Sequence, residues 1–99
     1  MNPMLEGMLE TALYARDLDE AEAFYESVLG LEKITRAANR HVFFRCGPGV
    51  LLIFNPEETV KPPSPDALQV PPHGTTGQGH ACFRVSGRNI NAMAERLTA

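Results

Sequence analysis

The sequence has no long apolar run and no cluster of basic residues, and each absence argues against a class of partner. No stretch approaches the roughly 18 apolar residues of a membrane-spanning helix. The lysines and arginines are scattered and the net charge is −3, which argues against binding to nucleic acid or to an anionic membrane surface. The start, MNPMLEGMLE, lacks the basic and hydrophobic regions of a signal peptide. We therefore expect a cytoplasmic protein that binds a small molecule or another protein.

Cysteine is scarce, and its spacing does not suggest a zinc site. The two cysteines, Cys46 and Cys82, have no Cys or His companions at the short spacings that structural zinc requires. Both fall within predicted strands, so we expect reduced, buried thiols. The chain has 99 residues, of which 43% are apolar, enough for the core of one small domain.

The first half of the chain reads as one strand, one helix and three further strands. Alternating residues predict a strand over 9–15. In RDLDEAEAFYESVLG, Asp17 suits the N-cap of a helix and Gly30 suits its left-handed end. Shorter strands are predicted at 31–35, 41–46 and 50–54, and the turn CGPGV joins the last two as a hairpin.

The segment between Asn55 and Gln78 is rich in proline. It contains six of the eight prolines, which neither a helix interior nor a central strand accommodates. We interpret it as a linker. PPHGTTGQG also has glycines suited to hinges beside His73, so a lid over a site is the alternative.

After the linker the pattern of the first half starts again. GHACFRVS alternates as a strand over 80–86, and RNINAMAERLTA has one apolar helical face. When the two strands are superposed, Glu10 corresponds to His80. The sequence therefore predicts an α+β fold in three parts: a first βαβββ module at residues 1–55, a linker at 56–78 and the strand and helix of a truncated second module at 79–99.

Three stretches carry a family resemblance: LETALYARDLDEAEAFYESVLGLE, HVFFRCGPGVLLIFNPE and GHACFRVS. In this order they resemble the opening, the hairpin and the second-module strand of the vicinal oxygen chelate superfamily, which includes glyoxalase I, bleomycin resistance proteins and extradiol dioxygenases. The resemblance covers nearly the whole chain. It implies that two βαβββ modules form an open cup, with helices outside and a ligand or divalent metal inside.

The resemblance also implies site residues. The family's metal ligands fall on Glu10 in the first module and on His80 in the second, where a carboxylate and an imidazole suit iron, manganese, zinc or nickel. A further ligand of glyoxalase I falls on Leu51 or a close neighbour in an all-apolar run, so that ligand is absent. The last family ligand would follow Ala99, so the sequence carries at most half of a metal site.

Other polar residues are candidates for binding a substrate. Tyr14, Arg45, Arg84 and Asn55 are expected to face the cup, where an arginine suits a carboxylate or enolate oxygen. The alternative for each arginine is a solvated charge paired with a glutamate.

The resemblance predicts a divalent-metal-dependent lyase, isomerase or dioxygenase acting on a small oxygenated molecule. Two alternatives stay open: a metal-free protein that binds a small molecule or sequesters an antibiotic, and a fragment of a longer enzyme without a function of its own. An incomplete second module leaves a strand edge unpaired and the apolar face of its helix uncovered. We therefore expect at least a homodimer, formed through that strand or through the edge of the first module.

Overall fold

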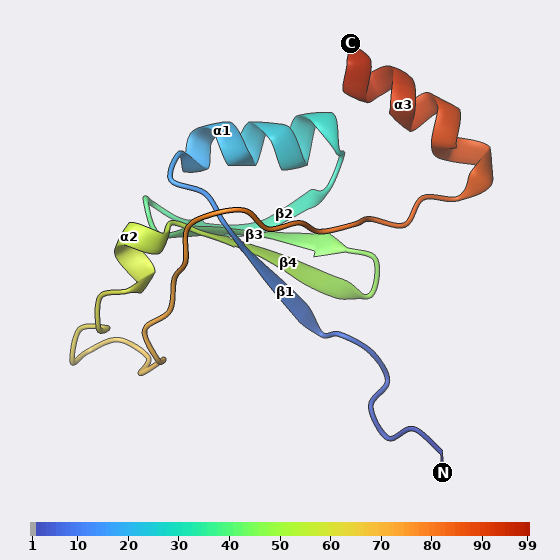
Figure 1. Ribbon diagram of the computed structural model, residues 1–99. Helices are drawn as coiled ribbons and strands as arrows, with labels where there is room; N and C mark the ends of the chain where they lie inside the picture. Colours follow the sequence, from blue (N-terminus) through green and yellow to red (C-terminus); the bar gives the residue numbers. More distant parts are fainter. Residues whose placement is uncertain (1) are drawn as a thin grey trace.

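The computed structural model describes residues 2–99 and contains one four-stranded sheet (Figure 1). Its strands are β1 (Glu10–Tyr14), β2 (Glu32–Ala37), β3 (His41–Cys46) and β4 (Gly49–Phe54), in the order β1-β4-β3-β2. The pairs β2–β3 and β3–β4 are antiparallel, and β1 pairs with β4 in parallel. The predicted α+β class and the βαβββ order are confirmed, with strand boundaries shifted by a few residues.

One helix covers one face of this sheet. It begins as α1 (Leu18–Glu22) and continues as the π-helix η1 (Ala23–Val28). The Asp17 carboxylate accepts a hydrogen bond from the Glu20 amide at 3.0 Å, as the predicted N-cap requires. Gly30 ends the helix with a φ of +76°, a conformation that glycine adopts without strain. The sequence therefore predicts both ends of the helix, although not the π turn at its C-terminal half.

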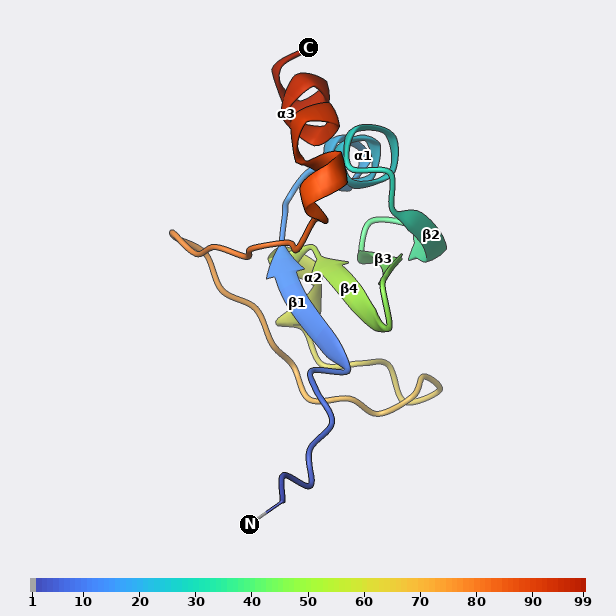
Figure 2. The same cartoon turned by 90° about the vertical axis from the view of Figure 1, so that its right-hand side faces the viewer.

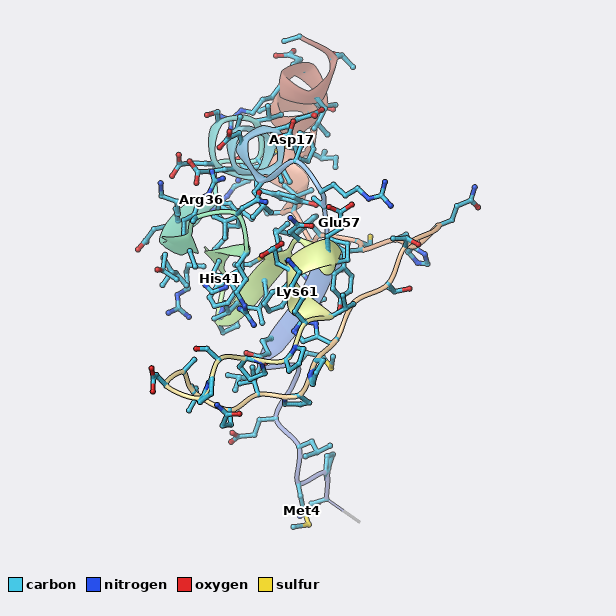
Figure 3. The ribbon with its side chains drawn as sticks, turned by 90° about the vertical axis from the view of Figure 1, so that its left-hand side faces the viewer. Met4, Asp17, Arg36, His41, Glu57 and Lys61 are labelled. Atoms are coloured by element: carbon cyan, nitrogen blue, oxygen red, sulfur yellow. The ribbon has the colours of Figure 1, made fainter. Side chains whose placement is uncertain are left out.

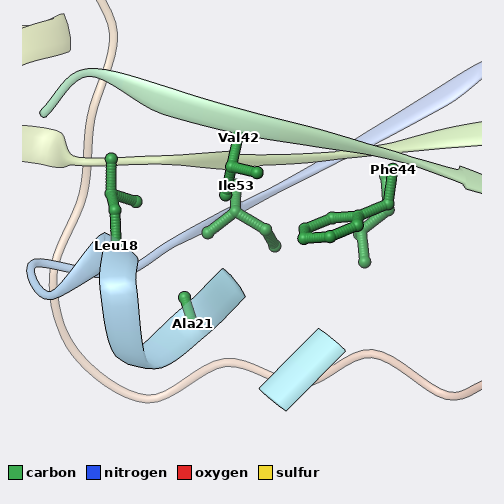
Figure 4. Packing of buried hydrophobic residues seen from close by; sticks show 6 residues of the cluster. Leu18, Ala21, Val42, Phe44 and Ile53 are labelled. Atoms are coloured by element: carbon green, nitrogen blue, oxygen red, sulfur yellow. The ribbon is translucent and has the colours of Figure 1, made fainter. Parts of the chain in front are cut away.

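The core lies between this helix and the sheet (Figure 4). Side chains from β3 and β4 point toward the helix and pack on its first turn; the buried cluster comprises Leu18, Ala21, Val42, Phe44, Leu51 and Ile53. Each of these side chains is less than a tenth exposed. Since alternate residues of a strand point to opposite faces, the neighbours of these core residues point to the other side of the sheet.

The proline-rich segment contains one short helix that the sequence analysis does not predict. It starts with the short helix α2 (Pro56–Thr59), capped by Asn55, whose side-chain oxygen accepts a hydrogen bond from the Glu57 amide at 3.1 Å. Proline is compatible with the first turn of a helix because the amide hydrogen there needs no intrahelical partner. Residues 60–73 then pass on the side of the sheet opposite α1 (Figures 1 and 2).

The predicted strand over 80–86 does not form. These residues run to the short turn η2 (Gly87–Asn89) and the helix α3 (Ile90–Thr98), the second predicted helix, without pairing to any strand of the described residues 2–99. Alternation alone does not make a strand, because the backbone groups need a partner edge. Cys82, in this unpaired stretch, is exposed, and Cys46, at the end of β3, is only half-buried, so the expectation of two buried thiols is wrong.

Among residues 2–99, no helix has the length and apolar character needed to span a membrane.

Candidate functional site

The candidate site lies on the face of the sheet that points away from α1, called the distal face below. The registers of β1, β3 and β4 place nine side chains there: Glu10, Ala12, Tyr14, His41, Phe43, Arg45, Val50, Leu52 and Phe54. Three of the six predicted site residues, Glu10, Tyr14 and Arg45, therefore share one face.

The distal face has two polar ends. At one end Glu10 and Arg45 lie on either side of Val50, with which both are paired in the sheet. At the other end Tyr14 and His41 lie on either side of Phe54. Glu10 and Tyr14 are four residues apart on one strand, so the two ends are separated by about 13 Å.

The Tyr14 end is completed by a residue from the proline-rich segment. The phenol oxygen of Tyr14 lies 2.8 Å from Nδ1 of His73. The His73 ring also packs edge-to-face on Phe54, with ring centroids 4.5 Å apart. The backbone amide of His73 donates to the Thr59 carbonyl at 2.9 Å, which fixes the segment where it meets the sheet.

His41 lies on the opposite side of Phe54 from Tyr14, and Arg40 is its neighbour in the chain. The His41 ring stacks on Phe43 with centroids 4.1 Å apart, and the Arg40 guanidinium carbon lies 5.7 Å from the centre of the Phe54 ring. Burial, followed by the positive charge of Arg40, lowers the pKa of His41. The imidazole is therefore neutral at pH 7, and its Nδ1 can accept the hydrogen bond that an Arg40 N–H donates at 2.7 Å.

Residues 60–73 cover part of the distal face and form with it an open cavity of about 870 Å³. Leu52 and Phe54 point away from α1, yet their exposed fractions are only 8% and 6%. Figure 3 shows His41 at the start of β3 and Lys61 where the covering segment begins after α2. The cavity has an apolar centre, with Glu10 and Arg40 also in its lining.

The two predicted residues of the second module lie elsewhere. His80 lines a second cavity, of about 990 Å³, with Phe24, Tyr25 and Phe83, and Tyr14 borders that cavity as well. Arg84 is exposed and lines neither cavity. Within one chain Glu10 and His80 thus line different cavities, because residues 80–86 do not join the sheet beside β1.

The donor groups of the described chain do not complete a metal site. Among residues 2–99, no three His, Cys, Asp or Glu side chains are grouped closely enough to hold a metal ion. Leu51, where the resemblance led us to expect the position of a glyoxalase I ligand, is a core residue with 3% exposure. Glu10 is the single carboxylate at the predicted metal position of the first module.

Asn55, also expected to face the cup, has a structural role instead. Its exposed fraction is 1%; its oxygen caps α2 and its amide donates to the Asn39 carbonyl at 3.1 Å. Sequence reasoning did not assign Arg40, His41 or Phe43 to the site. The alternation in HVFFR, which already placed Arg45, was the signal that could have found His41 and Phe43.

A model of the Glyoxalase/Bleomycin resistance protein/Dioxygenase superfamily matches residues 7–99. A search of curated proteins found no match. Among solved structures, a lactoylglutathione lyase from Agrobacterium tumefaciens is similar with a TM-score of 0.81 and 42% sequence identity, covering 95% of this chain and 69% of that protein.

Two more distant structures share the fold. An integron cassette protein from the mobile metagenome of the Halifax Harbour sewage outfall has a TM-score of 0.69 and 21% sequence identity. The match covers 95% of this chain and 70% of that protein. The other is a mutant of the fosfomycin resistance protein FosX from Listeria monocytogenes, complexed with Mn(II) and 1S,2S-dihydroxypropylphosphonic acid. It has a TM-score of 0.63 and 17% sequence identity, and the match covers 96% of this chain and 64% of that protein.

Proposed function

Because the chain belongs to the glyoxalase/bleomycin resistance protein/dioxygenase superfamily, we propose that it is a divalent-metal-dependent enzyme acting on a small oxygenated molecule. The observation that carries this proposal is the position of Glu10 on the distal face. Glu10 lies level with Arg45, because both pair with Val50, and it shares strand β1 with Tyr14. Of the lyase, isomerase and dioxygenase reactions, the lyase reaction is favoured because the structure with 42% identity is a lactoylglutathione lyase.

The metal site of this proposal is shared between two chains. Glu10 and His80 line different cavities of one chain, so we place Glu10 of one subunit beside His80 of the partner subunit. β1 is an edge strand, and one of its edges faces no other strand of residues 2–99. A second copy can pair there, which is a common fate of an open sheet edge.

The donor chemistry suits iron, manganese, zinc or nickel, since one ligand is a carboxylate and the other an imidazole. These two ligands are fewer than the three protein ligands of a typical catalytic site, so this chain supplies part of the site. A divalent ion bound there would polarise oxygen atoms of the substrate. We assign to Arg45, which pairs with Val50 beside Glu10, the role of binding a negatively charged oxygen of the substrate, and Arg84 of the partner subunit is the second candidate.

Mixed variants test whether the site is shared. Glu10→Gln and His80→Ala are each expected to abolish uptake of Mn(II), measured by equilibrium dialysis and elemental analysis. When the two variants are mixed and allowed to exchange subunits, half of the dimers are mixed and each contains one intact pair, so about a quarter of the binding should return. No recovery in exchanged dimers would contradict a shared site. Unchanged uptake by both single variants would contradict the assignment of the ligands.

A metal-free binding protein is the second candidate function, and the covered cavity favours it. Leu52 and Phe54, from the apolar strand VLLIF, line that cavity, whereas Leu51 and Ile53 belong to the core. If small ligands raise the thermal midpoint equally in EDTA and in Mn(II), the metal is not needed for binding. Turnover of lactoylglutathione in Mn(II), and none in EDTA, would instead support the lyase. The cytoplasmic location, the three-part division of the chain and the fragment alternative stay predictions.

A further inference from the structure

We propose that Arg40 is the anion-binding residue of the cavity between the distal face and residues 60–73, and that this cavity takes a small carboxylate with a flat, apolar body. The inference deepens the proposed function and rests on the same small-molecule site, but it requires no metal. It is carried by the position of one guanidinium at the edge of an aromatic surface that the chain's own residues cover.

The apolar body of the ligand would lie on Phe43, Leu52 and Phe54. The Phe43 and Phe54 rings meet edge-to-face with centroids 5.5 Å apart. All three residues line the cavity, and its volume of about 870 Å³ falls within the usual range for small-molecule sites. Flat unsaturated groups bind well on such surfaces, because aromatic rings favour edge-to-face and offset packing.

Arg40 lies at one end of this surface, where its backbone and its side chain both form hydrogen bonds. Its backbone amide donates to the Ala37 carbonyl at 2.7 Å, and its own carbonyl accepts from the Asn55 amide at 2.8 Å. One N–H of its guanidinium donates to the neutral His41 ring at 2.7 Å. The remaining N–H groups stay available for a carboxylate, since Arg40 makes no ion pair among the described residues.

The other charges that line the cavity leave this end positive. Lys61 and Glu58 form an ion pair with each other at 2.9 Å. Glu10 lies at the opposite end of the distal face, about 13 Å along β1 from Tyr14. An anion bound at Arg40 therefore meets no unpaired carboxylate nearby. An anion at the Glu10 end would meet one.

Binding of 1-naphthoate tests the proposal, with 1-naphthalenemethanol as its uncharged counterpart. Both are titrated in EDTA and followed by naphthalene fluorescence, so that failure of the proposed metal site does not affect the result. We expect the wild-type protein to bind naphthoate at least tenfold more tightly than the alcohol, and Arg40→Gln to bind both equally, because one charge-assisted hydrogen bond contributes a factor of this size. Arg40→Lys should restore part of the preference, since it keeps the charge but not the planar fork.

The matched control is Arg88→Gln, which removes the same charge from η2, outside both cavities. It should bind naphthoate like the wild type. Circular dichroism and the thermal midpoint show whether Arg40→Gln keeps its fold; equal binding of the alcohol by this variant and the wild type shows that the apolar surface is intact. The proposal is overturned if naphthoate does not bind the wild type, if it binds no better than the alcohol, or if Arg40→Gln and Arg88→Gln bind it equally.

Discussion

The phenol oxygen of Tyr14 lies 2.8 Å from Nδ1 of His73, although 59 residues separate the two in the sequence. This contact joins the edge strand β1 to the end of the segment that covers the distal face. Nearby, the His73 amide donates to Thr59, so a side chain and a backbone group hold the same point. Residues 60–73 therefore lie against the distal face at this point; their roles as a linker or as a lid over a site stay predictions.

Removing the Tyr14 hydroxyl should loosen the cover without unfolding the sheet. Tyr14→Phe loses a hydrogen bond worth about 0.5 to 1.5 kcal/mol, so the amides of residues 60–73 should exchange with deuterium several-fold faster. Tyr25→Phe is the matched control because Tyr25 packs against Phe44 in the core, away from this segment. If exchange over 60–73 is the same in both variants, the Tyr14–His73 contact does not hold the segment.

The two helix caps should differ in their contribution to stability. Asp17→Ala removes an exposed cap and should lower the free energy of unfolding by about 1 kcal/mol. Asn55→Ala should cost more, because Asn55 is buried and its loss also leaves the Asn39 carbonyl without its side-chain donor. Urea unfolding of the two variants measures both values. Equal losses would contradict a second structural role for Asn55.

Local patterns predict the first half of the fold well. The cap at Asp17, the left-handed Gly30 and the alternation of the strands depend on near neighbours, and the structure contains each of these features. The shared face of Glu10, Tyr14 and Arg45 follows from the same alternation once β1 pairs with β4 and β4 with β3. These parts of the site were accessible from the sequence because a period of two fixes the face.

The remaining parts depend on contacts that no local pattern encodes. The strand predicted at 80–86 alternates correctly, but it pairs neither with the open edge of β1 nor with any other strand of residues 2–99. His73 reaches Tyr14 only because the proline-rich segment turns back across the sheet. The importance of Arg40 depends on the neighbouring His41 ring and on Phe54, fourteen residues further along the chain.

Acid should destabilise the protein partly through His41. Burial and the Arg40 charge lower the pKa of His41 in the folded state, below the 6.5 of an ordinary histidine. The unfolded chain therefore takes up a proton first as the pH falls below about 6.5, and the free energy of unfolding decreases from there toward the folded pKa. His41→Gln should reduce this pH dependence, measured by urea unfolding at several pH values between 7.5 and 5. An unchanged pH dependence would mean that other groups cause the acid sensitivity.

The exposed apolar side chains of the C-terminal part predict self-association. Phe83, Ile90 and Leu97 are 42%, 50% and 51% exposed. Full burial of one such side chain contributes roughly 1.5 to 3 kcal/mol to the free energy of association. A few of them therefore supply a substantial part of the free energy that holds a dimer together. Since β1 also has an open edge, a second copy has both an apolar surface and a strand to pair with.

Light scattering of variants shows whether these side chains form a dimer interface or stay exposed in a monomer. We expect the wild type to have twice the monomer mass at micromolar concentration, and the double variant Ile90→Glu/Leu97→Glu to be monomeric, because charges at a buried interface cannot be solvated. Leu68→Glu is the control, since Leu68 is 83% exposed but lies in the covering segment. A wild type that stays monomeric would show that the chain tolerates these exposed side chains, and it would also remove the basis for a metal site shared between Glu10 and His80 of the partner subunit.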